Sequence, residues 1–307
     1  MKFLNNRIDK IKDKKVFTFF DKLTYRILNH DILSYGASLT YFLVLSVFPF
    51  LISLINAINF SGILNLKYIF SMLEVLPADI QNTVTTFLKE LQNASSSSFF
   101  TISFIAGLFT ASTAVFKLIK IINLSYGFSE KRNFFKLRFL ALIFTISLII
   151  MFFMLIFTQI FGEIIYKTVM SYLGAESAVF NKIWSLGKNV IPLGYMLIIF
   201  MLLYKFSPSD SKEHMITFKG VLPGAVFSTL GVIIVSIVFG FYVSNFGKYS
   251  ITYGSLGGII VFLVWLYLLS VIILIGAEIN STIYSMKYFK TLNIWPRHDS
   301  MFKNIKD

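Results

Sequence analysis

The chain has 307 residues, of which 56% are hydrophobic and only 14% are charged, whereas an ordinary soluble domain has about 25% charged residues. This composition excludes a typical soluble globular protein and, with repeated long apolar runs, predicts an all-α integral membrane protein. The formal net charge is +13 and there is no cysteine, which excludes disulfides, thiolate metal sites and a cysteine nucleophile.

The first 33 residues form a lysine-rich segment ahead of the first apolar run. Hydrophobic residues recur among its lysines, which predicts a basic amphipathic helix lying on the membrane surface. The first apolar run is too long for the apolar region of a signal peptide, so we expect it to remain as a membrane anchor. We therefore expect a cytoplasmic amphipathic segment at 1–33, a membrane domain at 34–285 and a cytoplasmic basic tail at 286–307.

Six apolar runs are long enough to cross a bilayer as helices, which takes about 20 residues each. The fourth is the weakest, because Lys188 and Pro192 lie near its start. Solid apolar runs, without alternation of polar and apolar residues, exclude a β-barrel. The predicted transmembrane helices are about 34–58, 99–121, 138–161, 187–205, 220–243 and 254–281.

The long connection between the first two runs carries apolar residues at helical spacing on both sides of Pro77. This pattern predicts two short amphipathic helices in the first outer loop. These helices would cap the bundle or lie on the outer leaflet. Whether they bind a ligand there stays open.

The distribution of basic residues predicts the orientation of the chain. Of the 28 lysines and arginines, 22 fall in segments on one side of the predicted bilayer and six on the other. Because basic residues concentrate on the cytoplasmic side, both termini are expected in the cytoplasm. The chain then reads as a multi-pass protein of the bacterial cytoplasmic membrane. The positive charge of the chain is explained by its topology and by attraction to anionic lipid headgroups, which are the expected partners. We expect no binding of nucleic acid.

Polar residues inside the apolar runs are costly in lipid and therefore face the bundle interior or a wet cavity. They form one stripe on the first run and another on the sixth, each within about an 80° arc. These stripes predict either interhelical hydrogen bonding or a hydrated substrate path. Prolines that allow a break in three runs favour the path. The candidate path residues are Ser38, Tyr41, Ser46, Pro49, Asn56, Tyr267, Ser270 and Glu278.

Glu278 lies roughly 35 Å along the sixth run, near the cytoplasmic surface. It shares a stripe with Tyr267 and Ser270, which predicts that it faces the bundle and not lipid. Two interpretations stay open at this point. Glu278 is either an interfacial carboxylate paired with lysine or arginine, or a group that binds a proton or cation.

Small residues on the second and fifth runs predict close helix packing. They are Gly107, Ala111 and Ala114 on the second run, and Gly224, Ser228 and Gly231 on the fifth. His30, His214 and His298 are scattered singly, without metal-binding spacing, and are expected to be ordinary surface histidines. We expect no metal site and no cofactor.

Four stretches carry a resemblance to a known family. They are GASLTYFLVLSVFPF (36–50), INLSYGFSEKRNFFKLRFLAL (122–142), GVLPGAVFSTLG (220–231) and YGSLGGIIVFLVWLYLLSVIILIGAEIN (253–280). Together they resemble the YihY/BrkB family of bacterial inner-membrane proteins, once misannotated as ribonuclease BN. The resemblance covers about 20–285 and implies six transmembrane helices with both termini in the cytoplasm. Asn123, Tyr126 and Arg132 stand at family positions and, with Asn280, are expected at the cytoplasmic mouth.

The sequence thus favours a transporter or exporter of a lipid-like or anionic envelope solute, using a polar cleft between helices. The alternative is a non-transporting scaffold or an assembly or lipid-organising factor for envelope machinery, acting with an envelope protein partner or as a homo-oligomer. We expect no enzyme activity and no catalytic residue. Hydrolytic RNA cleavage would need metal ligands or an acid–base pair, and the expected cytoplasmic acids are dispersed.

Overall fold

The computed structural model describes residues 15–61, 97–160, 166, 171, 178–209, 215–246 and 256–288. Within these ranges the chain forms seven helices and no strand. Both amphipathic helices predicted for the first outer loop lie outside the described residues. So do residues 1–14 and the tail from residue 289 onward.

A short amphipathic helix precedes six long apolar ones. The short helix is α2 (Lys15–Asn29). The long helices match the six predicted apolar runs, and the largest difference is the earlier start of α9. They are α3 (Ile32–Ser61), α6 (Ser97–Ser125), α7 (Phe134–Ile160), α9 (Ala178–Phe206), α10 (Phe218–Phe246) and α12 (Leu256–Tyr288).

Four of these helices, α6, α7, α10 and α12, are long and apolar enough to cross a membrane. The other two, α3 and α9, contribute shorter apolar stretches among the residues whose side chains are described, Ile32–Val47 and Val190–Phe206. The all-helical membrane architecture is therefore confirmed at the level of helix length and composition.

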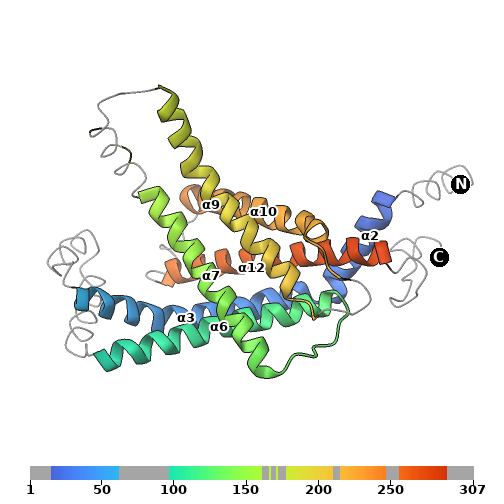
Figure 1. The fold of residues 1–307 in the computed structure, drawn as a ribbon, viewed down its shortest axis with the longest axis horizontal. Helices are drawn as coiled ribbons and strands as arrows, with labels where there is room; N and C mark the ends of the chain where they lie inside the picture. The colour runs from blue at the N-terminus through green and yellow to red at the C-terminus, as the bar shows by residue number, and fades with distance from the viewer. Residues whose placement is uncertain are drawn as a thin grey trace, which may run out of the picture.

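The six long helices contact one another in a closed ring that follows chain order. Each helix packs against the next one along the chain, and α12 completes the ring by packing against α3; Figure 1 shows α3 and α6 running side by side. The short helix α2 lies against α12. Consecutive helices are thus neighbours, as is usual for elements that follow one another in a chain.

Residues with left-handed backbone conformation and a helix cap shape the turns at one end of the bundle. Asp31 adopts a left-handed backbone conformation with φ 51°, which lets the chain turn sharply between α2 and α3. Gly127 does the same after α6, with φ 73°, as is common for glycine after a helix. Asn133 caps α7 by accepting the Lys136 amide at 3.0 Å. We call this end of the bundle, which carries α2, the 126–133 connection and the last turns of α9 and α12, the basic end.

Glycines bring neighbouring helices into close contact, as the small-residue patterns predicted. A Cβ atom on Gly224 of α10 would overlap the carbonyl of Gly276 on α12. A Cβ atom on Gly107 of α6 would lie 3.1 Å from the backbone nitrogen of Phe50 on α3. Both contacts leave no room for a larger residue without movement of a helix.

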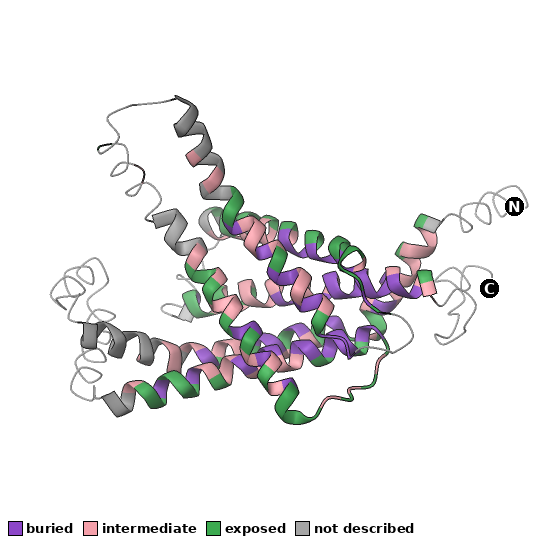
Figure 2. Cartoon of the chain, viewed as in Figure 1, coloured by how far each residue is buried: buried purple, intermediate pink, exposed green. Residues whose placement is uncertain are grey.

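Buried residues gather toward the basic end, whereas large apolar side chains cover the outside of the helices (Figure 2). Phe135 is 80% exposed and Ile237 66% exposed. Apolar exposure on this scale is unusual for a soluble monomer and is what lipid contact requires.

Candidate functional site

Glu278 is completely buried on the inner face of α12, as its stripe predicts. Ser270, Leu274 and Ser281 lie on the same face and are also buried. A buried carboxylate is stable only with hydrogen-bond donors or positive charge around it.

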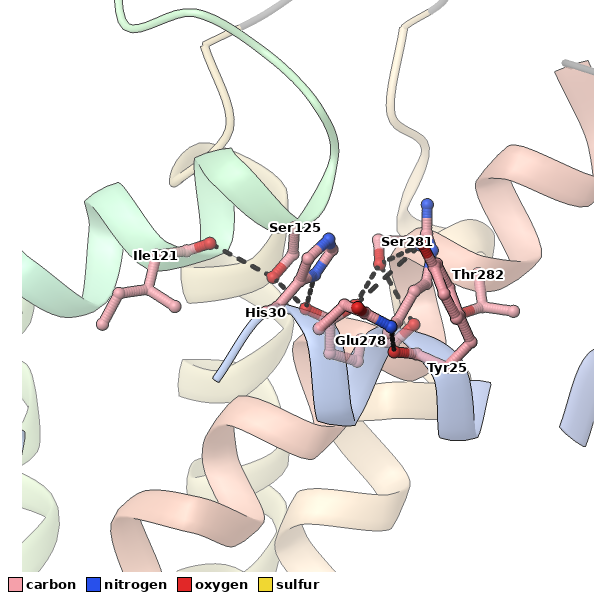
Figure 3. Close-up of polar contacts among 9 residues, drawn as sticks. Tyr25, His30, Ile121, Ser125, Glu278, Ser281 and Thr282 are labelled. Atoms are coloured by element: carbon pink, nitrogen blue, oxygen red, sulfur yellow. Dashed lines mark hydrogen bonds and ion pairs between the residues drawn. The ribbon is translucent and has the colours of Figure 1, made fainter. Parts of the chain in front are cut away.

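The partners of Glu278 come from α2, from the turn after it, from α6 and from α12 itself (Figure 3). His30, which follows α2, places Nδ1 2.7 Å from Oε1 of Glu278. Ser125 at the end of α6 donates its hydroxyl to the same oxygen at 2.6 Å. The other oxygen lies 3.9 Å from Nη1 of Arg26, which also donates to the Ser281 hydroxyl at 2.6 Å. We call these five residues the Glu278 cluster.

The expectation that His30 is an ordinary surface histidine was wrong. Its side chain is only 13% exposed and contacts Glu278, and Arg26 is only 4% exposed. The physical reason is that a buried carboxylate needs hydrogen-bonding groups or positive charge around it, and Arg26 of α2 and His30 just after α2 lie against Glu278. One signal was available in the sequence: Arg26 and His30 are four residues apart, a spacing that puts two side chains on the same side of a helical turn, and the His30 amide does bond to the Arg26 carbonyl although α2 ends at Asn29.

The Glu278 cluster supports the first of the two interpretations, a carboxylate paired with a basic group. The cluster joins α2, α6 and α12 through polar side chains that form hydrogen bonds or an ion pair with one another. Burial lowers the pKa of the Arg26 guanidinium while the Glu278 charge opposes that shift. Binding of a proton or cation by Glu278 stays a prediction.

The candidate path residues on α3 point mainly toward α6. Ser38 accepts a hydrogen bond from Lys117 at 3.1 Å, and Pro49 packs on Gly107. Ser46 is buried and donates to the carbonyl of Leu43 in its own helix at 2.6 Å. Tyr41 does not join them, because its side chain is 59% exposed. Asn56 belongs to α3, but its side chain lies outside the described part of the chain.

The candidate path residues on α12 lie elsewhere. Tyr267 packs where α12 approaches Gly36 of α3, Ser270 is buried, and Glu278 belongs to the cluster above. Among the candidate residues whose side chains are described, a set without Asn56, the structure therefore does not gather the α3 and α12 stripes at one polar cleft. The stripes face different neighbours because α3 packs against both α6 and α12.

Two of the expected mouth residues, Asn123 and Asn280, fasten backbone segments together. Asn123 accepts from the amide of Ser209 at 2.7 Å and from its hydroxyl at 3.0 Å, which ties α6 to the segment after α9. Asn280 accepts from the amide of Gly224 at 2.7 Å and donates to the carbonyl of Val221 at 3.0 Å. Asn280 is completely buried between α10 and α12.

Arg132 binds the backbone at the end of α9 and the side chain of Glu130. It pairs with Glu130 through Nη2 at 2.6 Å and Nε at 2.8 Å. It also donates to the carbonyls of Phe206 at 3.0 Å and Ser207 at 2.5 Å. Burial raises the pKa of Glu130, but hydrogen bonds from Arg132 outweigh this and hold it below its ordinary value.

Tyr126, the remaining expected mouth residue, is buried among aromatic rings. It stacks on Phe128 and meets Tyr284 edge-on. Its hydroxyl has no hydrogen-bond partner among the residues that the structure describes. All four expected mouth residues thus lie toward the basic end, where they contact protein groups.

An apolar groove of about 470 Å³ lies between α3, α6 and α7. Ser46 on α3, Gly107 and Ala111 on α6, and Thr145 on α7 line it. Its other walls are almost entirely aliphatic and aromatic, with phenylalanines from all three helices. The groove offers a surface suited to hydrocarbon.

A second hollow of about 620 Å³ lies at the basic end, where α7 begins and α9 ends. We call it the basic cleft. It is lined by Lys131, Arg132, Asn133, Lys136, Lys205, Phe206, Pro208, Ser209 and Ile216. The distribution of basic residues along the sequence predicted the orientation of the chain, but it did not predict that these lysines line one cleft.

No group of three or more His, Cys, Asp or Glu side chains able to hold a metal occurs among the described residues.

Known proteins are similar to this sequence, and one family model matches most of its length. The family model described as virulence factor BrkB matches residues 23–300. A ribonuclease-like protein of Bacillus subtilis, YfkH, is 32% identical over 271 residues, which cover 88% of this chain and 96% of YfkH. A UPF0761 membrane protein of Pseudoalteromonas translucida is 31% identical over 95 residues, covering 31% of this chain and 30% of that protein.

A UPF0761 membrane protein of Xanthomonas axonopodis pv. citri is also 31% identical, over 33% of this chain and 23% of its own length. No solved structure gave a significant match. The chain therefore belongs to the virulence factor BrkB family of membrane proteins.

Proposed function

We propose that the protein is a transporter of a lipid-like envelope solute in the bacterial cytoplasmic membrane. The observation that carries this proposal is the apolar groove between α3, α6 and α7, which is large enough for hydrocarbon and is lined from three helices. Pro49 lies in α3 beside the groove, packed on Gly107. A proline removes a backbone hydrogen bond, so this part of α3 is suited to movement.

In this proposal all six long helices cross the bilayer, and the basic end faces the cytoplasm. A helix of 27 residues, the length of α7, spans about 40 Å, which exceeds the roughly 30 Å of the hydrocarbon core. The described residues of the basic end include Lys131, Lys136, Lys205 and Lys287, in agreement with the positive-inside rule.

The groove also changes the proposed route. The sequence favoured a polar cleft between the stripes of α3 and α12, but those stripes face different neighbours. A solute with an apolar portion can instead enter between helices from the lipid side, with Ser46 offering a polar group inside the groove. An anionic headgroup would then travel with the apolar portion.

One observation favours the alternative, a non-transporting scaffold or lipid-organising factor. The Glu278 cluster and the Asn280 contacts hold the helices of the basic half of the bundle close together through buried hydrogen bonds. A packed bundle of this kind would also serve as a platform for an envelope protein partner or a second copy of the chain.

A lipid-movement assay separates the two functions. The purified protein would be placed in vesicles of phosphatidylethanolamine and phosphatidylglycerol that contain a fluorescently labelled phosphatidylglycerol. Quenching from outside reports how fast the label crosses. Ala111→Trp fills the groove, whereas Ile234→Trp adds the same side chain on α10, where Ile234 is 57% exposed and does not line the groove.

The transporter proposal expects faster label movement than in protein-free vesicles. It further expects Ala111→Trp to return the rate to the protein-free level, and Ile234→Trp to keep the wild-type rate. No acceleration by the wild-type protein would favour the scaffold, and an unaffected Ala111→Trp variant would rule out the groove as the route.

We do not extend the ribonuclease-like name of YfkH to this chain. Metal-assisted RNA cleavage uses clustered acidic or histidine ligands, and the part of the chain that the structure describes holds no such group. Metal-dependent RNA cleavage by the purified protein, lost on substitution of one acidic residue, would overturn this position.

A further inference from the structure

The basic cleft brings together positive charges from segments far apart in the chain. Lys131, Arg132 and Lys136 come from the connection before α7 and from its first turn, and Lys205 comes from the last turn of α9. Two apolar residues, Pro208 and Ile216, form part of the same wall. The hollow therefore combines several ammonium groups with a partly apolar lining.

The basic side chains of the cleft differ in how far other protein groups already engage them. Arg132 already donates to Glu130 and to two backbone carbonyls, so it holds the wall in place. Glu130, an acidic residue in the described part of this region, is engaged by Arg132. Lys131 and Lys136 have no ion pair within the described ranges.

Lys205 is held by an aromatic ring and not by an acid. Its ammonium lies 3.6 Å from the centroid of the Phe218 ring. A cation–π contact of this kind orients the amine while leaving its positive charge uncompensated. Three lysines therefore surround one hollow with little negative charge among the described residues.

We propose that the basic cleft binds the phosphate group of an anionic amphiphile. Lysine ammonium groups bind phosphate as compact point charges, and clustered basic residues next to a bilayer favour anionic lipid headgroups. A carboxylate would satisfy fewer donors, since phosphate offers more acceptor oxygens.

The surroundings of the cleft favour a lipid as the source of this phosphate. Phe135, Phe206, Met215 and Phe218 are large, apolar and exposed beside it, and Met215 is 73% exposed. Such side chains sit favourably at the level where headgroups meet hydrocarbon. A soluble phosphate ester shares the recognised chemistry, so the test has an arm for each source.

This inference deepens the proposed function by naming the headgroup chemistry, and it rests on the proposed function only for its biological purpose. Binding is measured without transport. If the protein binds phosphate in the basic cleft but moves no lipid, the transport proposal fails and the present inference stands. If it moves lipid but does not bind phosphate in the cleft, the inference fails and the transport proposal stands.

The lipid arm uses native mass spectrometry of the purified full chain with phosphatidic acid, and with phosphatidylcholine as the zwitterionic comparison. The variants are Lys131→Gln, Lys136→Gln and the double variant. The matched controls are Lys219→Gln and Lys287→Gln, which remove the same charge from exposed positions outside the cleft. Unchanged melting temperatures show that the variants are folded.

We expect phosphatidic acid to bind more tightly than phosphatidylcholine. Each cleft substitution should weaken phosphatidic acid binding about fivefold, the effect of one basic residue near a charged surface, while both controls bind as wild type. The soluble arm repeats the series with glycerol 3-phosphate by calorimetry. If glycerol 3-phosphate shows the lysine dependence and phosphatidic acid does not, the cleft is a phosphate site for a soluble ester.

Two results would overturn the inference. The first is equal weakening by the cleft and control substitutions, which would reduce the effect to general surface charge. The second is the absence of lysine-dependent binding in both arms.

Discussion

His30 and Glu278 are 248 positions apart in the chain, yet His30 Nδ1 lies 2.7 Å from Glu278 Oε1. This contact, with the nearby Arg26 guanidinium, fixes α2 to the inner face of α12. Helix α2 is therefore part of the buried structure on one side, while Val16, Phe20 and Leu28 remain exposed on the other. An amphipathic segment expected only to lie on the membrane surface also completes the core.

Glu278→Gln should loosen α2 from the bundle. Glutamine keeps the size of the side chain but removes the charge, so Arg26 is left buried without its counter-ion, a change that costs about 3–5 kcal/mol in buried pairs. We expect a lower melting temperature and faster amide hydrogen exchange across α2. Unchanged exchange in α2 would show that the cluster does not hold it.

A double substitution gives the matched control for this effect. Arg26→Met combined with Glu278→Gln removes both charges, so its destabilisation should be smaller than the sum of the two single changes. This result also bears on transport. Because Glu278 and Arg132 both stabilise the fold, loss of transport in Glu278→Gln or Arg132→Ala would not by itself place either residue on a substrate path.

The Glu130–Arg132 pair should stabilise the basic end only above acidic pH. The pKa of Glu130 is held below its ordinary value of 4.5, so its contribution is present above that value and is lost as pH falls through the lower folded pKa. Glu130→Gln should cost about 1–3 kcal/mol near neutrality. The measurement is the melting temperature of both proteins across pH.

The difference in melting temperature between wild type and Glu130→Gln should begin to shrink as pH falls below 4.5, and it should be smallest below the lower folded pKa of Glu130, where both side chains are uncharged. Other carboxyl groups titrate equally in the two proteins and cancel in the comparison. A difference that stays constant with pH would contradict the proposed role of the ion pair.

Gly276→Ala should force α10 and α12 apart. A Cβ atom there would overlap the Ser228 hydroxyl and lie 2.6 Å from the Tyr204 hydroxyl, and overpacking of this kind costs about 1–3 kcal/mol. Gly258→Ala is the control in the same helix, because its Cβ atom would meet nothing within 4 Å. Thermal unfolding should show destabilisation by the first change alone, and equal melting temperatures would refute the close approach.

The proposed topology can be read by cysteine labelling without background, since the chain has no cysteine. A membrane-impermeant maleimide should label Ser95→Cys, in the first outer connection, on intact cells. Lys131→Cys at the basic end should react only after the membrane is permeabilised. Labelling of Lys131→Cys in intact cells would reverse the proposed orientation.

Several features follow from the sequence because they depend on local periodicity and chain order. The positions of the six apolar helices come from runs of apolar residues, and the inward face of Glu278 comes from its spacing with Ser270. The close helix contacts at Gly107 and Gly224 follow from small residues at helical spacing.

The tertiary structure alone decided which inward-facing groups meet. The polar residues of α3 and α12 have similar periodicity, yet Ser38 meets Lys117 of α6 and Glu278 meets His30 beside α2. Periodicity gives the direction of a side chain around one helix axis. It does not give the rotation or crossing angle of neighbouring helices, and these determine which charges share a buried site and which lysines converge on the basic cleft.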